Sequence, residues 1–490
     1  MIRKMSFINS ANLFPNAVRF KVSLLFITLF YMASTANSTV TKVVSIVALQ
    51  SAINAAQSGD TIQLANGTYL NNSISVSKSN ITIKPETIGS VFLNGTNTIV
   101  LSGNYIVFNG FQFTNGTASG SAITATGNHN HMTNLNFNGY GGVHMINIYG
   151  QYDTVSYSNF QNKPVTSFVA GGGTSDMVQV TPNADPSTPG YNVIRYCSFQ
   201  HMPGLGGDFG NECIRLGQST YSDYISRTLI EYCYFEDTGL GDSEAISVKC
   251  KENCIRNNTM RNNPLAMFVF RNGDDNVAYG NFFLRSGGIR VKQSNNIYIY
   301  NNYFENCSTN APIYFEYYGA GFGDNFNVIN NTFYRGRASI INSQLTNCTW
   351  ANNIFYSDTA TLFSGTNSGQ TFTNNIYSGS KGLTINTGMT SANPLLTYNA
   401  NGFYMLSASS PAIDASSASY PTILDITGID DDPSISKDIQ GFSRPATVTL
   451  KDLGCNEFTS GTVSNRPLYL SDVGPSYLTS ATSFNCDACH

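Results

Sequence analysis

Short runs in which apolar and polar residues alternate recur along most of the chain, and each run ends on one aromatic or large apolar residue. The segment VFNGFQF ends at Phe113, and MTNLNF ends at Phe137. The same position recurs at Phe160, Phe199, Phe235, Met260, Phe283, Phe304, Phe333, Phe355 and Tyr377. Most of these positions lie about 21 to 25 residues apart, a period typical of β-solenoids. The pattern therefore predicts an all-β fold, a right-handed parallel β-helix (solenoid) with one coil per period.

An asparagine lies two positions before the aligned residue in six successive coils. These residues are Asn258, Asn281, Asn302, Asn331, Asn353 and Asn375. Stacked side-chain amides can hydrogen-bond along a column, and asparagine tolerates the left-handed conformation of tight bends. The two preceding coils carry Cys197 and Cys233 at this position. We therefore expect the two thiols to be neighbours; a disulfide and simple packing both fit the sequence, and packing is favoured.

The two ends of the repeat have different patterns. Residues 48–57 have helical spacing and precede a strand-like segment at 60–64, so we expect a short N-terminal capping helix over the open end of the stack. Residues 409–414 and 438–458 are expected to pack back on the last coils. Residues 459–490 are rich in Ser and Thr and nearly uncharged, which predicts a loose C-terminal tail. The CxxC motif at 486–489 within it is expected to form a disulfide or free thiols rather than a metal site.

Residues 1–36 have the features of a secretory signal peptide. Basic residues precede an apolar run at 22–32, and small residues follow it. The run is shorter than the roughly 20 residues that a membrane-spanning helix needs, although an uncleaved anchor is the alternative. The predicted organisation is therefore a signal peptide (1–36), a β-helical domain (37–458) and the tail (459–490). A secreted protein agrees with the 10 cysteines, and the chain carries N-glycosylation motifs at Asn66, Asn71, Asn80, Asn94, Asn115, Asn257, Asn306, Asn330 and Asn347.

The chain carries little charge. Only 11% of its residues are Asp, Glu, Lys or Arg, and the formal net charge is -4. Non-specific nucleic-acid binding needs a broad basic surface, so this composition argues against a nucleic-acid partner. A cluster of cations in such a chain is correspondingly more informative.

Such a cluster occurs between residues 211 and 290, where an apolar residue is followed by a cation four times. The cations are Arg215, Lys249, Arg271 and Arg290, and they follow Ile214, Val248, Phe270 and Ile289. If the pairs occupy successive coils, the apolar residues point inward and the cations share one outward face. Like charges on adjacent rungs repel. Either the cations pair with nearby acids such as Asp208, Asp242 and Glu244, or they form a binding strip for an extended polyanion, which we favour.

Three side chains near these cations, Asn211, Asp242 and Glu244, carry the hard oxygen atoms that Ca²⁺ prefers. Solvated carboxylates at a turn would explain the two acids equally well. Asp242 and Glu244 share one face of a strand, whereas Lys249 has the opposite parity. The acids and the lysine can face the same groove only if the strand bends between Glu244 and Ala245.

The stretch resembles polysaccharide lyase family 6, the β-helical alginate lyases and chondroitinase B. The similar motifs are NECIRLG at 211–217, DSEAISVK at 242–249, RNG at 271–273, GNFF at 280–283 and GGIR at 287–290. The resemblance implies Ca²⁺-assisted β-elimination at a 4-linked uronate, with Ca²⁺ held by Asn211, Asp242 and Glu244. Lys249 would be the base and Arg271 the acid, and Arg215, Asn272 and Arg290 would contact the substrate. Two positions depart from the commoner pattern, because Asp242 replaces Glu and Asn272 replaces His.

The predicted partner is an acidic polysaccharide, bound by a secreted monomer with no membrane contact after signal cleavage. The low charge favours alginate over dermatan sulfate, because sulfate recognition would need further basic residues. A non-catalytic, glycan-binding β-solenoid is the alternative of a different class. A polygalacturonase-like hydrolase needs two carboxylates that flank the scissile bond, and the adjacent pair Asp274 and Asp275 falls in a predicted turn.

Overall fold

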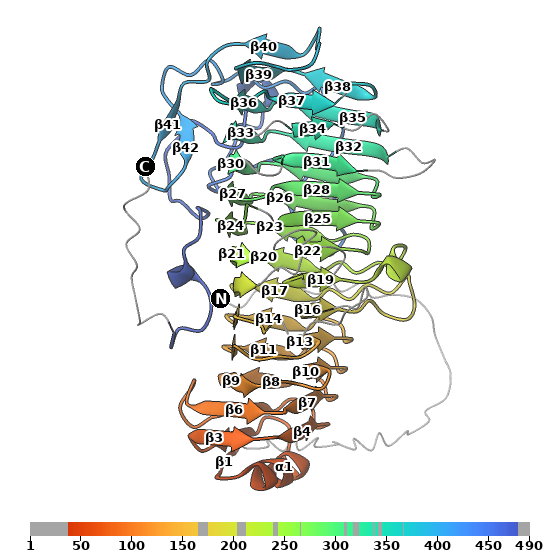
Figure 1. The fold of residues 1–490 in the computed structure, drawn as a ribbon, viewed down its shortest axis with the longest axis vertical. Coiled ribbons are helices and arrows are strands. Elements are labelled where there is room, and N and C mark those ends of the chain that lie inside the picture. Colours follow the sequence, from red (N-terminus) through yellow and green to blue (C-terminus); the bar gives the residue numbers. More distant parts are fainter. Residues whose placement is uncertain are drawn as a thin grey trace, which may run out of the picture. The chain divides into compact units, whose positions relative to one another are not determined.

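The computed structural model describes residues 38–478 except 165–174, 203–211, 239–243, 265, 308–310, 317–322, 337–338, 342–344 and 366. Residues 1–37 and 479–490 lie outside this range, so the predicted signal peptide and the CxxC motif stay predictions. The described part is a parallel β-helix, as predicted (Figure 1). No helix among the described residues is long and apolar enough to cross a membrane.

Three parallel sheets, named A, B and C, run the length of the described solenoid, and each coil contributes one strand to each sheet. Sheet A is built, in order, from β1 (Val40–Val43), β2 (Thr61–Leu64), β5 (Thr82–Pro85), β8 (Val107–Asn109), β11 (His131–Thr133), β14 (Thr154–Ser156), β17 (Val193–Arg195), β20 (Leu229–Glu231), β23 (Cys254–Arg256), β26 (Asn276–Tyr279), β29 (Ile297–Tyr300), β32 (Gly323–Ile329), β35 (Leu345–Ala351) and β38 (Gln370–Thr373). Sheet B is built from β3 (Gly67–Leu70), β6 (Val91–Gly95), β9 (Phe111–Gly116), β12 (Asn136–Asn138), β15 (Asn159–Gln161), β18 (Ser198–Met202), β21 (Tyr234–Thr238), β24 (Thr259–Arg261), β27 (Phe282–Leu284), β30 (Tyr303–Cys307), β33 (Thr332–Gly336), β36 (Ile354–Tyr356), β39 (Asn375–Ser378) and β40 (Met389–Ser391).

Sheet C carries the candidate site. It is built from β4 (Ser73–Val76), β7 (Thr98–Leu101), β10 (Ser121–Ala125), β13 (His144–Ile148), β16 (Asp176–Val180), β19 (Ile214–Leu216), β22 (Glu244–Val248), β25 (Met267–Arg271), β28 (Ile289–Lys292), β31 (Ile313–Glu316), β34 (Ser339–Ile341) and β37 (Phe363–Gly365). The remaining described elements are the helix α1 (Ile46–Ala55), the antiparallel pair β41 (Leu396–Tyr398) and β42 (Tyr404–Leu406), and the 3-10 turns η2 (Ser219–Tyr221), η3 (Val448–Leu450) and η4 (Leu470–Asp472).

The predicted coil register is confirmed at every aligned position. Parallel pairing in sheet B places Phe113 beside Phe137 and continues rung by rung as far as Phe355 and Tyr377. Neighbouring rings in this column stack face to face, for example Phe199 on Phe235 with centroids 4.9 Å apart. Two further rungs of sheet B, β6 and β3, precede the first aligned residue. The stacked rings therefore lie inside the coils and make one continuous apolar core.

The predicted asparagine column forms a hydrogen-bonded ladder. The amide Nδ2 of Asn281 donates to Oδ1 of Asn302 over 3.0 Å, and Asn302 repeats this contact with Asn331 over 3.1 Å. The left-handed residue is the one before the ladder position, as at Asn301 with φ 55°. Cys197 and Cys233, lower in the same column, are buried free thiols, so packing rather than a disulfide is confirmed for this pair.

A short helix closes the N-terminal end of the described coils, as predicted. Helix α1 begins two residues before the predicted start, because the Ser45 hydroxyl caps it by accepting the Ala48 amide over 3.2 Å. Leu49 and Ile53 are fully buried against the first coils. The helix thereby covers apolar side chains that the open end of the stack would expose.

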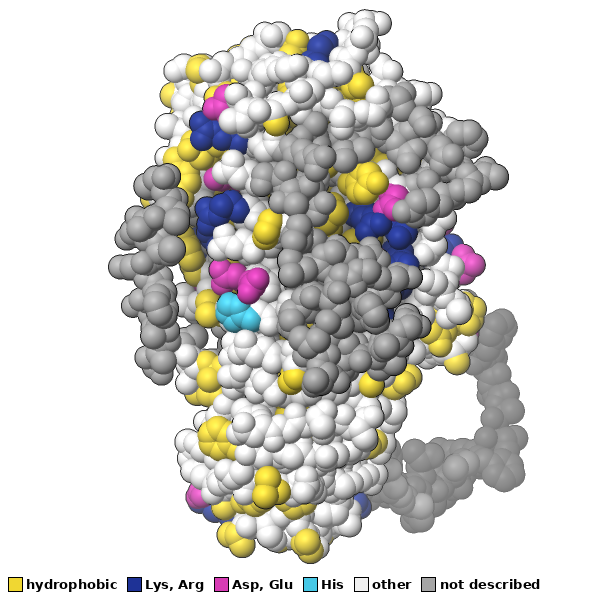
Figure 2. Space-filling model, viewed as in Figure 1, with side chains coloured by type: hydrophobic (Ala, Val, Ile, Leu, Met, Phe, Trp, Pro, Cys, Tyr) yellow, Lys and Arg dark blue, Asp and Glu magenta, His cyan; other side chains and the backbone are white. Residues whose placement is uncertain are grey.

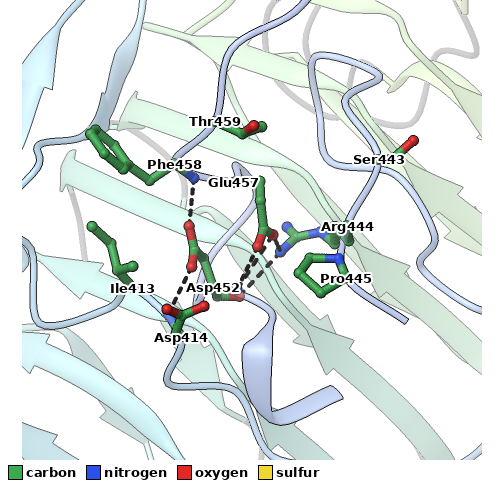
Figure 3. Close-up of a pocket in the computed structure, with 9 residues that line it drawn as sticks. All are labelled: Ile413, Asp414, Ser443, Arg444, Pro445, Asp452, Glu457, Phe458 and Thr459. Atoms are coloured by element: carbon green, nitrogen blue, oxygen red, sulfur yellow. Dashed lines mark hydrogen bonds and ion pairs between the residues drawn. The ribbon is translucent and has the colours of Figure 1, made fainter. Parts of the chain in front are cut away.

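The segment after β40 packs back along the coils, as predicted, and a buried arginine anchors it (Figure 3). The Arg444 guanidinium pairs with Glu457 over 2.8 Å and donates to Oδ1 of Asn301, on the left-handed corner of a coil, over 3.0 Å. A cavity of about 500 Å³ lies beside it, lined by Asp414 and Asp452 among others. Figure 3 shows the carboxylates of this segment turned toward backbone amides and the arginine, so their hydrogen bonds hold the segment to itself and to the coils.

The prediction of a loose tail is wrong for residues 459–478. The Leu468 amide donates to the Thr259 hydroxyl over 2.8 Å, and the Gly474 amide donates to the Tyr196 carbonyl over 2.8 Å. Leu468 and Val473 are buried against Tyr234 of sheet B. A few apolar residues suffice for this docking. Because Ser and Thr dominate the composition of the segment, the composition did not indicate that these apolar residues are buried.

Candidate active site on sheet C

The four predicted cations lie on the outward face of sheet C, but in two columns rather than one. Parallel pairing aligns Arg215 with Ser247, then with Val269 and Arg290. Val248 aligns with Phe270, so Lys249 and Arg271 occupy the next outward position, two residues further along the strands. The prediction that the cations share one outward face is therefore confirmed, and the pairing divides them between two columns of that face. The two-residue offset separates like charges and lowers their mutual repulsion.

The second column is the more accessible of the two. Arg271 is followed on the next rung by Lys292, and the Arg271 side chain is 23% exposed. Figure 2 shows Lys and Arg side chains gathered on this side of the molecule, at the height of β22–β28. The four apolar partners that precede the predicted cations are all fully buried, as expected.

The predicted bend after Glu244 is confirmed. A β-bulge lies between Glu244 and Ile246, and it brings Glu244 opposite Met267. The extra residue reverses the parity of the strand, so the Glu244 carboxylate reaches the outward face. It accepts a short hydrogen bond from the Ser247 hydroxyl and forms an ion pair with Arg271 over 3.2 Å. Glu244 and Arg271, which lie 27 residues apart in the chain, are thus direct neighbours.

Acids at the entry to the sheet C strands pair with cations of the following coil. Asp176 contacts Arg215 over 2.5 Å, and Glu212 contacts Lys249 over 3.2 Å. Together with the Glu244–Arg271 pair, these contacts make three successive diagonal ion pairs. Pairing with acids, the alternative we did not favour, is therefore what the described residues show. Of the acids expected to take part, Glu244 does so, and Asp208 and Asp242 lie outside the described residues.

The predicted contact between Arg215 and a substrate is not compatible with its burial. The Arg215 side chain is 1% exposed, and its Nε donates to Oε1 of Gln179 over 2.6 Å. With Asp176 on its other side, the guanidinium is enclosed and has no free surface for a polymer. Arg290 lies further along the same face, where it pairs with Glu316 and lies over the Tyr314 ring. Asn272 follows Arg271 in a left-handed turn with φ 66° and is half-buried.

Burial and ion pairing shift several pKa values in this cluster. Burial opposes ionisation of Asp176, but its ion pairs with Arg215 and His144 hold the pKa below the usual value. Burial raises the pKa of Glu244, and the neighbouring charge of Glu212 raises it further against the opposing effect of Lys249 and Arg271. Glu212 and Glu244 thus form a pair of crowded, buried carboxylates. Such a pair is stabilised by nearby positive charge.

The described residues provide one of the three predicted Ca²⁺ ligands. Glu244 faces the outward side of sheet C, whereas Asn211 and Asp242 lie outside the described residues. Within the described ranges, no group of three His, Cys, Asp or Glu residues has the geometry of a metal site. The chemistry of the donors nevertheless fits a hard cation, because crowded carboxylates are the ligands that Ca²⁺ takes.

Sequence reasoning missed Glu212 and Asp176 as members of this site. Glu212 stands inside the NECIRLG motif, directly after a predicted metal ligand, so the motif itself was a usable signal. Asp176 lies in the long interval between Phe160 and Phe199, where no coil position could be assigned from the spacing. Pairing in sheet C places Asp176 beside His144, whose Nδ1 lies 2.6 Å from its carboxylate.

Comparison with known sequences now identifies the family. A sequence model described as Chondroitinase B matches residues 43–312. The chain belongs to the chondroitinase B family, polysaccharide lyase family 6. The match covers more than half of the chain and contains both cation columns of sheet C. The comparison with curated proteins gives no match.

Solved structures of family 6 lyases share the fold. The family 6 alginate lyase AlyGC superposes with a TM-score of 0.62 at 22% identity, covering 76% of this chain and 55% of AlyGC. The chain thus spans about half the length of AlyGC. A family 6 polysaccharide lyase from Pseudopedobacter saltans gives a TM-score of 0.60 at 19% identity over 89% of this chain and 99% of that one. A mannuronic acid specific family 6 lyase from human gut microbiota gives 0.55 at 19% identity over 72% and 91%.

Proposed function

We propose that this protein is a secreted polysaccharide lyase that cleaves alginate by Ca²⁺-assisted β-elimination. The observation that carries the proposal is the pairing of Val248 with Phe270, which sets Lys249 and Arg271 on adjacent rungs of one outward column. Adjacent strands lie about 4.8 Å apart, so two groups on neighbouring rungs can reach the same sugar unit. Membership of polysaccharide lyase family 6 gives these residues their expected chemistry.

In the proposed reaction Lys249, in its neutral form, removes the proton from C5 of a uronate unit. The electron pair forms the C4–C5 double bond, and the bond from C4 to the glycosidic oxygen breaks. Arg271 lies one rung further along and stabilises the negative charge that develops on this oxygen. Because a guanidinium hardly deprotonates, a water molecule that Arg271 orients is the source of the final proton.

Ca²⁺ held by Asn211, Asp242 and Glu244 would neutralise the uronate carboxylate and make the C5 proton more acidic. Support for this ligand set comes from the bulge that turns Glu244 outward and from the proximity of its buried carboxylate to that of Glu212. In the described structure Arg271 supplies a positive charge to Glu244. A bound cation would release Arg271 from that pair toward the substrate.

The choice of alginate rests on two kinds of support. Three solved neighbours with the same fold are described as alginate or mannuronic acid lyases, and the low overall charge suits an unsulfated polymer. Dermatan sulfate is the second candidate, because the matching family model carries the name of chondroitinase B. Arg290 and Asn272 are the proposed substrate contacts, since both are only partly buried on this face.

The test is incubation of the purified protein with alginate and, separately, with dermatan sulfate in the presence of Ca²⁺. Elimination creates a double bond conjugated to the carboxylate, so ultraviolet absorbance rises as the product forms. We expect a rise with alginate, loss of the rise with a chelator, and its return when Ca²⁺ is restored. Binding of alginate without any rise would instead identify a non-catalytic glycan-binding solenoid.

A further inference from the structure

Lys249, the base predicted for the reaction, belongs to a series of buried side chains that contact one another. The Lys249 ammonium lies 3.2 Å from Oε1 of Glu212, and both side chains are almost fully buried, at 8% and 3% exposed. Lys249 follows the last residue of β22, so its flexible side chain leaves the strand at a corner. An ion pair with a fixed carboxylate restricts that side chain to one direction.

The Glu212 carboxylate also lies near a second cation, Arg215. Its second oxygen, Oε2, lies 3.9 Å from the Arg215 guanidinium and has no hydrogen-bond partner among the described residues. Arg215 occupies the rung of Glu212, three residues further along the chain, and is buried. Its charge therefore faces Glu212 in a medium of low polarity, where the attraction is stronger than at a surface.

Arg215 is fixed on two further sides. Asp176 contacts its guanidinium over 2.5 Å, and Gln179 accepts from its Nε over 2.6 Å. The Gln179 amide donates in turn to the carbonyl oxygens of Val180 and Gly217, at 3.0 Å and 3.3 Å. These contacts tie Arg215 to the backbone of two coils, so its position is set by the solenoid.

We infer that Glu212 and Arg215 are positioning residues for Lys249. Glu212 holds the lysine amine, and Arg215 holds Glu212, so that the amine stays on the rung beside Arg271. Neither residue contacts the polysaccharide, although the motif suggested that Arg215 would. The inference rests on the proposed function for its kinetic part, while the contact between Glu212 and Lys249 can be tested without any substrate.

The kinetic test compares the variants Glu212→Gln and Arg215→Lys with Arg290→Lys as the matched control. Loss of a group that orients a reacting residue costs roughly 10- to 100-fold in activity. We expect Glu212→Gln and Arg215→Lys to lower kcat by about this factor with KM within about twofold, because only the reacting geometry changes. Arg290→Lys should raise KM with a smaller effect on kcat. A raised KM with unchanged kcat in Arg215→Lys would show that Arg215 binds substrate and would overturn the inference.

A second measurement needs no catalysis. The folded protein is treated briefly with acetic anhydride, and acetylation of each lysine is followed by mass spectrometry. We expect Lys249 to react at least several-fold faster in Glu212→Gln than in the wild type, while Lys292 reacts at the same rate in both. An unchanged Lys249 rate would overturn the inference. If the wild type acts on no uronate polymer, the proposed function fails, and the acetylation rates still decide the positioning role. If Glu212→Gln does not fold, Arg215→Lys is measured in the same way.

Discussion

Replacement of Asp153 by asparagine should stabilise the protein at alkaline pH. Asp153 lies at the corner between sheets C and A, in a second ladder that otherwise uses asparagine on both sides. Its Oδ1 accepts the Asn130 amide over 2.6 Å, and its own amide donates to Oδ1 of Asn192 over 2.8 Å. The residue is fully buried, and its Oδ2 has no hydrogen-bond partner among the described residues. At the equivalent position of the neighbouring coil, the side-chain Nδ2 of Asn192 donates to the Gly150 carbonyl over 3.1 Å. The carboxylate of Asp153 has no N–H group with which to make such a bond.

The sign of the effect follows from the direction of the pKa shift. Burial raises the pKa of Asp153 from 3.8 to about 7, against the opposing hydrogen bond from Asn130. The folded state therefore holds this proton more tightly than the unfolded chain. The stabilisation is fully present below the unfolded pKa and is lost as the pH rises through the folded value. This rise in the pKa of Asp153 corresponds to at most about 4 kcal/mol of unfolding free energy.

The assay is urea denaturation of the wild type and Asp153→Asn at about pH 4 and about pH 8, with thermal midpoints as a second measure. Because other carboxylates titrate in both proteins, the difference between them isolates Asp153. We expect the variant's advantage to grow with pH and to approach a few kcal/mol at the higher value. The reciprocal variant Asn192→Asp should lose stability at that pH. A difference that stays constant with pH, or a variant that is less stable at about pH 8, would refute the reasoning.

Three other predictions concern the described fold. Asn302→Ala removes the Oδ1 that accepts both the backbone and the side-chain amide of Asn281, and it should lower the unfolding free energy by about 3 kcal/mol in urea denaturation. A substitution at the half-buried Asn138, whose Oδ1 accepts one hydrogen bond from Asn162, should lower it less. Leu468→Ser should lower the thermal midpoint and speed proteolysis after residue 458, because the docked tail loses a buried side chain; a truly loose tail would leave both unchanged. Thiol titration in denaturant without reductant should find both Cys197 and Cys233 reactive, and a disulfide-linked peptide pair in their place would contradict the described packing.

The coil register could be predicted from the sequence because one side chain per coil is selected for the inside of the solenoid. A ring at Phe199 must stack on one at Phe235, and the asparagine ladder requires the same residue at the same corner. These constraints act on each coil alike, so they leave a periodic trace. The capping helix was predictable for a similar reason, since its spacing differs from that of the strands.

The arrangement of the cations could not be predicted in the same way. An apolar residue followed by a cation fixes which side chain points outward, but it does not fix how far along the strand the pair lies. Arg215 and Lys249 therefore looked equivalent. Arg215 in fact lies opposite Ser247, two residues before Lys249, so the two cations occupy different columns. The ion pairs of Arg215 depend on Asp176, a residue of the preceding coil within a long interval. Such contacts leave no local pattern.

The most direct test of the proposed function is the absorbance change that the wild type and Lys249→Ala produce with alginate and Ca²⁺. Lys249 has its place beside Arg271 on sheet C whether or not the protein is an enzyme, so only the reaction distinguishes a lyase from a binding protein. We predict a steady rise with the wild type and no detectable rise with Lys249→Ala, while both proteins have the same thermal midpoint and sediment with the polymer. Equal rises from both proteins would contradict the assignment of Lys249 as the base.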